Sequence, residues 1–206
     1  MAIIAENNGT KRELIPQGNY VARCYQMIQI GTVKETFEGE TKILHKVRIG
    51  WELPEELRVF DEAKGEQPLV MSAEYTLSMH EKAKLRAILQ SWRGKAFTED
   101  EAKKFDITKL IGAPCLLNVI HKTTPNGTFA NIAGVTPLPK GMICAPAINN
   151  PFILSFDDWD NDKFNSLPDF IKNKIASSLE YEKIRNPHST SVEDLTADEE
   201  IQNLPF

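Results

Sequence analysis

Residues 69–94 read LVMSAEYTLSMHEKAKLRAILQSWRG, and the period of the hydrophobic pattern changes inside this stretch. Up to residue 77 the stretch is rich in β-forming side chains, which predicts a strand. Beyond Ser78 the apolar side chains recur at helical spacing until Gly94, a residue typical of helix ends. Ser78 and Glu81 have the S-x-x-E form of a capping box, which predicts that the helix starts there. The apolar face of this predicted helix consists of Leu85, Ile88, Leu89 and Trp92.

Two further strands are predicted before this stretch. Residues 18–32 are rich in β-formers, and residues 41–53 alternate between apolar and polar side chains. Trp51 lies in phase with the apolar face, which predicts that it belongs to the core. The polar stretch between Pro54 and Pro68 is predicted to be an excursion between strands.

After the helix, a second short helix is predicted from Thr98, followed by an apolar strand at residues 113–122 and a returning strand at residues 128–136. Asn126-Gly127 between these strands is a strong signal for a β-hairpin. The predicted order is therefore three strands, a helix and a two-stranded hairpin.

This order predicts a mainly β protein with the OB-fold, a five-stranded Greek-key barrel with a helix between strands 3 and 4. An open β-sandwich is the alternative, because the order alone does not specify strand pairing. The barrel domain is predicted at residues 1–145, and a linker with an amphipathic helical extension at residues 146–185, with a helix from Pro168 to about Tyr181. Residues 186–206 are predicted to be a disordered acidic tail.

The composition is typical of a soluble globular protein. No apolar run approaches the roughly 20 residues of a membrane-spanning helix. The first residues lack the pattern of a secretory signal, which predicts a cytoplasmic protein with no membrane partner. The three cysteines, Cys24, Cys115 and Cys144, lie far apart without a C-x-x-C pair, which favours buried thiols and no metal site. We expect no cofactor.

The net charge of −5 is unevenly distributed along the chain. Residues 1–150 contain 19 Lys and Arg against 17 Asp and Glu, a net charge of +2, whereas residues 151–206 contain 5 against 12, a net charge of −7. No basic residue follows Arg185, but five acidic residues do. The acidity therefore belongs to the C-terminal part, and the near-neutral body is compatible with a basic groove.

No catalytic motif is complete. Residues 158–162 (DWDND) open like a calcium-binding loop, but Lys163 stands where that loop requires Gly, and Asp169 where it requires Glu. Acidic residues that favour a helix N-terminus explain this cluster better. Because the glycine-rich phosphate-binding motifs and the G-x-S-x-G motif are also absent, we expect no enzyme.

The last ten residues, 197–206, read ADEEIQNLPF. Acids followed by a terminal hydrophobic-Pro-Phe resemble the C-terminal tip of bacterial single-stranded DNA-binding proteins, which docks onto replication and repair enzymes. The stretch 201–203 departs from that family, because it separates the acids from the apolar tip. The resemblance implies a partner-binding site in which a hydrophobic pocket takes the Phe and a basic rim meets the acids. Its residues are Asp198, Glu199, Glu200, Leu204, Pro205 and Phe206.

The body also resembles phage-encoded single-stranded DNA-binding or replication-associated proteins. The resembling pieces are short and together span most of the chain: residues 16–20, 75–78, 84–92, 110–115 and 167–181. The resemblance implies non-sequence-specific binding of single-stranded DNA during phage DNA replication, recombination or repair in the host cytoplasm. It also implies that the acidic tail recruits replication or recombination proteins.

Binding of a single strand requires cations along the backbone path and aromatic faces on which bases stack. The first two predicted strands and the predicted hairpin supply both types of side chain. A solvated strand face explains any one of these Lys residues better than DNA binding does, whereas the set as a whole favours binding. The predicted DNA-binding residues are Arg23, Tyr25, Lys42, Lys46, Arg48, His121, Lys122 and Phe129.

A second class of function fits the same sequence. A protein–protein adaptor of a phage replication or assembly complex, with a barrel that does not bind nucleic acid, agrees with the near balance of charge in residues 1–150. A metal-dependent nuclease has weaker support, from the acidic cluster at residues 158–162 and from Glu101 and Lys103. The sequence does not specify the oligomeric state, and a homo-oligomer is compatible with it.

Overall fold

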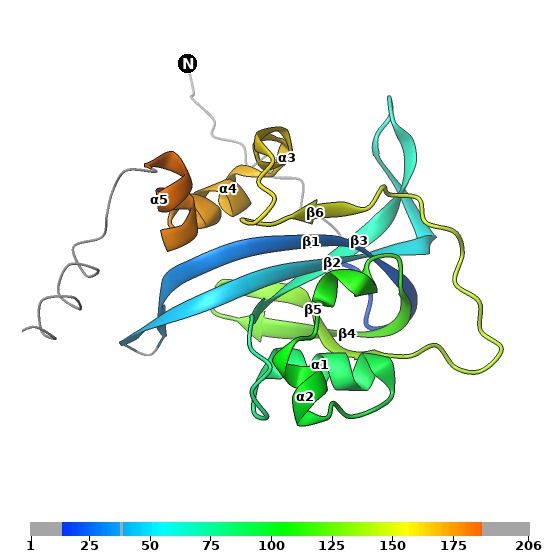
Figure 1. Ribbon diagram of the computed structural model, residues 1–206. Coiled ribbons are helices and arrows are strands. Elements are labelled where there is room, and N and C mark those ends of the chain that lie inside the picture. The colour runs from blue at the N-terminus through cyan, green and yellow to red at the C-terminus, as the bar shows by residue number, and fades with distance from the viewer. Residues whose placement is uncertain (1–13, 38, 187–206) are drawn as a thin grey trace, which may run out of the picture. The chain divides into compact units, whose positions relative to one another are not determined.

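Six strands and five short helices make up the described part of the chain (Figure 1). The computed structural model describes residues 14–37 and 39–186. The strands are β1 (Gly18–Phe37), β2 (Glu40–Asp61), β3 (Gly65–Thr76), β4 (Pro114–Thr124), β5 (Gly127–Thr136) and β6 (Phe152–Leu154). The helices are α1 (Lys84–Arg93), α2 (Glu99–Lys103), α3 (Asn161–Ser166), α4 (Asp169–Ala176) and α5 (Leu179–Arg185), with a 3-10 turn at Ile107–Leu110. The prediction of a mainly β protein is confirmed.

The strands pair in the order β3-β2-β1-β4-β5, and β6 pairs with β1 off this path. β1 and β4 are antiparallel, with Gly18 opposite Val119. β4 and β5 are also antiparallel, and the register shifts between Asn118 and Val119. β1 therefore lies between the strand that follows it in the sequence and a strand from much later in the chain.

The predicted Asn-Gly hairpin is confirmed. Thr124 and Gly127 are the last paired residues of β4 and β5, so Pro125 and Asn126 form the turn. Gly127 has a φ of +126°, a backbone angle that residues with a Cβ rarely adopt. A glycine at this position therefore suits the hairpin.

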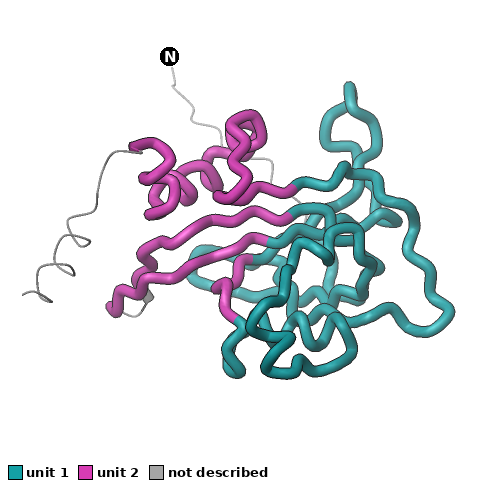
Figure 2. The backbone as a smooth tube through the Cα atoms, viewed as in Figure 1, with its two compact units in different colours: residues 1–26, 49–73, 79–152 teal, residues 27–48, 74–78, 153–206 magenta. Residues whose placement is uncertain are grey.

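β2 and β3 are longer than the sequence predicts. The stretch predicted to be an excursion continues both strands, which are closed by a turn at residues 61–65. In that turn the backbone N–H of Lys64 donates to the Asp61 carbonyl at 3.0 Å. Pro54 and Pro68 do not end the strands, because a proline disrupts pairing only where its missing N–H would be needed. The stretch is instead a hairpin that stands out from its unit in Figure 2, and we call residues 54–68 the β2–β3 arm.

Helix α1 has the predicted apolar face but not the predicted start. Its buried residues include Leu85, Ile88, Leu89 and Trp92, and Gly94 ends it with a φ of +67°. The capping box predicted at Ser78 is wrong, because α1 begins at Lys84. The buried Arg86 donates to the Met79 carbonyl at 3.0 Å, and this bond holds the segment before the helix in an irregular conformation. The start predicted for α2 is confirmed, since Thr98 forms a capping box there.

The C-terminal region is divided into more helices than the sequence predicts. One helix was expected from Pro168 to about Tyr181, but α4 ends at Ala176 and α5 begins at Leu179. Ser178 separates them, because its hydroxyl accepts a hydrogen bond from the backbone N–H of Tyr181, as N-cap serines commonly do.

The chain forms two compact units, and each unit includes parts of β1, β2 and β3 (Figure 2). Unit 1 comprises residues 1–26, 49–73 and 79–152, and unit 2 comprises residues 27–48, 74–78 and 153–206. In unit 1, α1 packs against β5, and Trp51 is fully buried in the core as predicted. In unit 2, Ile30 and Ile175 are fully buried. None of the described helices is long and apolar enough to cross a membrane.

Within unit 2 a single carboxylate ties α5 to β1. Glu180 accepts hydrogen bonds from the backbone N–H and from the hydroxyl of Thr32, both at 2.6 Å. Gly31 permits this close approach, since a Cβ at that position would lie 2.7 Å from Ser178 and Glu180. Burial alone would raise the pKa of the Glu180 carboxyl, but the hydrogen bonds from Thr32 outweigh burial and lower this pKa.

We expect Glu180→Gln to lower the free energy of unfolding at pH 7 by about 1 kcal/mol, because it removes the charge from two hydrogen bonds at a partly exposed site. A carboxyl whose pKa is lower in the folded state stabilises the protein above its unfolded-state pKa of about 4.3. That contribution is lost as the pH falls through the folded-state pKa. Urea denaturation at neutral and acidic pH should therefore show a smaller loss of stability with acid in the variant than in the wild type.

Glu182→Gln is the matched control, since Glu182 is exposed on the same helix. It should reproduce the wild-type dependence on pH. An equal loss of stability with acid in wild type and Glu180→Gln would show that the Glu180 contact does not contribute.

Candidate nucleic-acid interface

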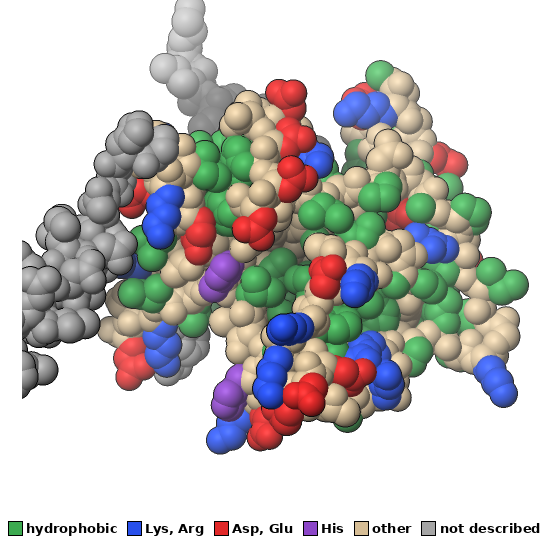
Figure 3. Space-filling view, viewed as in Figure 1, with side chains coloured by type: hydrophobic (Ala, Val, Ile, Leu, Met, Phe, Trp, Pro, Cys, Tyr) green, Lys and Arg blue, Asp and Glu red, His purple; other side chains and the backbone are tan. Residues whose placement is uncertain are grey.

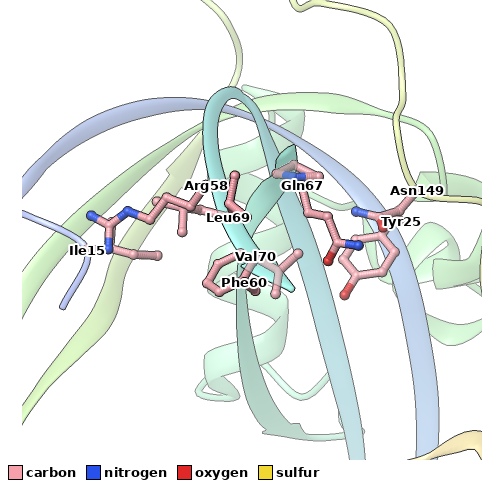
Figure 4. A pocket seen from close by; sticks show the side chains of 10 residues that line it. Ile15, Tyr25, Arg58, Phe60, Gln67, Leu69, Val70 and Asn149 are labelled. Atoms are coloured by element: carbon pink, nitrogen blue, oxygen red, sulfur yellow. The ribbon is translucent and has the colours of Figure 1, made fainter. Parts of the chain in front are cut away.

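A groove of about 930 Å³ lies beside the β2–β3 arm in unit 1 (Figure 4). Its walls come from three parts of the chain that are distant in sequence: β1 with the residues just before it, the β2–β3 arm with the adjoining part of β3, and the segment before β6. The volume lies within the range of pockets that take small molecules. The lining residues are Ile15, Tyr25, Arg58, Val59, Phe60, Gln67, Pro68, Leu69, Val70 and Asn149.

Aromatic rings, a guanidinium and amides share this groove. Phe60 is 63% exposed, and Tyr25 is partly buried. In Figure 4 the side chain of Gln67 extends toward Tyr25, and Phe60 lies next to Val70. Rings that stack on bases, an Arg for phosphates and amides for base edges are the groups that bind single-stranded nucleic acid.

Gly50 of β2 lies close to Gln26 and Tyr25 of β1. A Cβ added at Gly50 would lie 3.1 Å from the Cβ of Gln26 and 3.4 Å from Cε1 of the Tyr25 ring. A larger residue would therefore crowd the side chain of Gln26, whereas its Cβ would meet the Tyr25 ring at ordinary van der Waals distance. Gly50 thus leaves room for the Gln26 side chain next to Tyr25.

A fully buried carboxylate holds the segment that carries Asn149. Glu52 on β2 has an exposed fraction of 0%. Its carboxylate accepts hydrogen bonds from the backbone N–H groups of Ile148 at 3.1 Å and of Asn149 at 2.7 Å. A third bond comes from the side-chain amide nitrogen of Asn149 at 2.8 Å. These three donors satisfy a group that would be costly to bury alone, and they fix Asn149 at the groove.

The structure places the guanidinium of Arg23, a predicted DNA contact, inside unit 1. Its Nη1 donates to the Gly112 carbonyl at 2.6 Å, and its Nη2 donates to the Ala145 carbonyl at 2.9 Å and to the Cys144 carbonyl at 3.4 Å. Arg23 therefore holds the segment that leads to Asn149 against β1. Tyr25, two residues further along β1, is the predicted residue that lines the groove.

The β4–β5 hairpin brings two predicted residues together. Lys122 and Phe129 lie directly opposite each other in the sheet, and both are exposed, Phe129 by 47%. Ile120, which is 41% exposed, shares their face because side chains alternate along a strand. His121 points to the other face, where its Nε2 donates to the Ile15 carbonyl at 2.9 Å. Lys122 and Phe129 thus form a second exposed site with a cation next to a ring.

The predicted basic stripe of β2 lies in unit 2, where it is largely covered. Lys46 pairs with Glu35 at 2.5 Å and Arg48 with Glu74 at 3.3 Å, and the two cationic side chains are only 13% and 18% exposed. Lys174 of α4 lies 2.8 Å from Glu35 and 2.6 Å from Glu74, so it links the two pairs. The face predicted to point outward is therefore occupied by an ion-pair network at Lys46 and Arg48.

Within this network, the charged groups shift the pKa values of their partners. Burial alone would lower the pKa of Lys174 and raise that of Glu35, but their ion pairs outweigh burial, so the Lys174 pKa is raised and the Glu35 pKa is lowered. The Arg48 guanidinium also lies 5.5 Å from the centre of the Phe170 ring on α4. Lys42, by contrast, is 62% exposed and pairs with Glu40 at 3.2 Å.

Charges of both signs are interspersed over α1 and α2 of unit 1 (Figure 3). Glu101 lies 3.0 Å from Arg93 and 3.5 Å from Lys95. The Arg93 guanidinium also lies 4.0 Å from the centre of the Phe97 ring. These two helices therefore do not present the continuous positive track that follows a phosphate backbone.

The predicted partner-binding residues Asp198, Glu199, Glu200, Leu204, Pro205 and Phe206 lie outside the described residues. Within residues 14–37 and 39–186, no three His, Cys, Asp or Glu side chains are grouped so that they could hold a metal ion. Sequence reasoning missed Arg58, Phe60 and Gln67, because the β2–β3 arm was predicted to be irregular. The alternation of apolar and polar side chains that continues through Pro54 was the signal that could have predicted the extended strands of this arm.

No protein-family model matches the chain, and the searches of curated proteins and of solved structures find no match either.

Proposed function

We propose that this chain binds single-stranded DNA through an OB-fold barrel, without reading a defined sequence. The observation that carries the proposal is the groove in which Tyr25 and Phe60 lie with Arg58. Stacking on aromatic faces tolerates any base, and an Arg neutralises phosphates, so this combination suits sequence-independent binding. The proposed setting is phage DNA replication, recombination or repair in the host cytoplasm.

The strand order supports an OB-fold. The order β3-β2-β1-β4-β5, with α1 between β3 and β4, is the arrangement expected of this fold. OB-folds bind oligonucleotides on strands 2 and 3 and on the loops between strands 1 and 2 and between strands 4 and 5. The groove uses the β2–β3 arm, and the exposed Lys122 and Phe129 lie beside the loop between β4 and β5.

The acidic C-terminal residues are proposed to recruit replication or recombination proteins, as their resemblance to bacterial tips implies. The adaptor function is the second candidate. It is favoured by Leu57 and Val59, apolar residues of the β2–β3 arm that are 43% and 56% exposed. Exposed apolar side chains that lie close together are typical of surfaces that contact other proteins.

The test is fluorescence anisotropy of labelled oligo-dT with the full chain, at low and at moderate salt, with duplex DNA as control. We expect binding of the single strand that weakens as salt increases, because phosphate contacts release counterions, and much weaker binding of duplex. Failure to bind oligo-dT at low salt would contradict the proposal and favour the adaptor.

A further inference from the structure

The side-chain amide of Asn149 lines the groove in a fixed orientation. Its amide nitrogen donates to the Glu52 carboxylate at 2.8 Å. A carboxylate can only accept hydrogen bonds, so the NH₂ group of the Asn149 amide is the one that faces Glu52. The carbonyl oxygen Oδ1 is the other polar atom of this amide. The carboxylate itself is fully buried and held by two backbone N–H groups, so it cannot turn away. The Asn149 amide is therefore held in one orientation, in which its acceptor oxygen Oδ1 does not take part in the contact with Glu52.

A base that stacks on the Tyr25 ring would have its edge opposite the acceptor oxygen Oδ1 of Asn149. Asn149 and Tyr25 line the same groove and appear next to each other in Figure 4. Cytosine and adenine carry an exocyclic amino group where thymine and guanine carry a carbonyl oxygen. An amino group donates to Oδ1, whereas a carbonyl oxygen at the same place faces another acceptor.

We propose that Asn149 gives the groove a preference for cytosine and adenine over bases with a carbonyl at that position. This inference rests on the proposed function and adds a specificity-determining residue to it. Gln67 on the facing wall does not impose the opposite preference. No hydrogen bond to a described residue fixes its amide, so it can present either its donor or its acceptor. The preference is modest, because one hydrogen bond discriminates by only a few-fold.

The test compares oligodeoxycytidine with oligodeoxyuridine of equal length, about 12 nucleotides, by competition anisotropy at slightly alkaline pH. Cytosine and uracil have the same ring size and differ along one edge, so stacking is nearly matched. Wild type should bind the cytidine oligomer about 3–10-fold more tightly. Glu52→Gln should bring this ratio close to one, because the new amide can donate to Asn149 and let its amide turn over. Asn149→Ala should have the same effect.

Asn150→Ala is the control, since Asn150 is exposed and does not line the groove, and it should keep the wild-type ratio. The ratio is measured within each variant, so a general loss of stability does not mimic the result. Equal binding of both oligomers by wild type would overturn the preference and leave the proposed function intact. A ratio unchanged by both Glu52→Gln and Asn149→Ala would overturn the role of Asn149. Binding of neither oligomer would overturn the proposed function as well.

Discussion

Replacement of both Tyr25 and Phe60 with alanine is expected to weaken binding of oligo-dT by about 100-fold. Each stacked base contributes about 1–3 kcal/mol through its aromatic partner, and 1.4 kcal/mol corresponds to a factor of ten. Tyr25 and Phe60 are the rings that line the groove, on β1 and on the β2–β3 arm. The affinity is measured by anisotropy at fixed salt, and circular dichroism verifies that the variant is folded.

Phe170→Ala is a matched control, because Phe170 is 61% exposed, close to the 63% of Phe60, and belongs to α4 in unit 2. Its affinity for oligo-dT should equal that of the wild type. If the Tyr25 and Phe60 double variant binds normally while Phe129→Ala weakens binding, the DNA lies at the β4–β5 hairpin and the groove is not its site.

Replacement of Trp51 with alanine is expected to lower the free energy of unfolding by about 3–5 kcal/mol. Trp51 is fully buried, and its ring centre lies 5.8 Å from that of Trp92 on α1. Truncation leaves a cavity between β2 and the helix that packs on this part of unit 1. Since small domains are stable by only about 5–15 kcal/mol, the variant should unfold at a clearly lower urea concentration.

Trp51→Phe should be much milder, with a loss of about 1–2 kcal/mol. The ring is largely kept, and the change removes the indole Nε1, which is buried without a hydrogen-bond partner among the described residues. An unpaired buried donor costs about 1–3 kcal/mol, so its removal offsets part of the lost packing. A loss as large as that of Trp51→Ala would indicate that the Nε1 has a partner, such as a buried water.

The elements that follow from short stretches of sequence were predicted well. The β4–β5 hairpin follows from Asn126-Gly127, and the buried face of α1 follows from helical spacing up to Gly94. The start of α1 was missed because the Arg86 contact with Met79 is a tertiary feature of a buried cation, and the S-x-x-E pattern at Ser78 does not reveal it. The arm was missed because prolines are read as breaks, although a strand tolerates them where no pairing N–H is lost.

The candidate site was predicted only in part. Tyr25 lines the groove, and Lys122 and Phe129 lie together on an exposed face as their positions at the hairpin suggested. Lys46 and Arg48 share the predicted face, but that face is neutralised by Glu35 and Glu74. Alternation tells which residues share a face, and it does not tell what packs on that face.

The sequence by itself determined the presence and order of β1 to β5, the apolar face of the helix between β3 and β4, and the β4–β5 hairpin, because these depend on side chains within a few residues of one another. Only the tertiary structure decided which charges are exposed and which residues form the groove. Lys174 reaches Glu35 and Glu74 from much later in the chain, and Glu52 fixes Asn149 across a similar separation. In such contacts, a buried polar group takes its hydrogen-bond or ion-pair partner from a distant segment of the chain. Local periodicity does not indicate which distant residue that partner is.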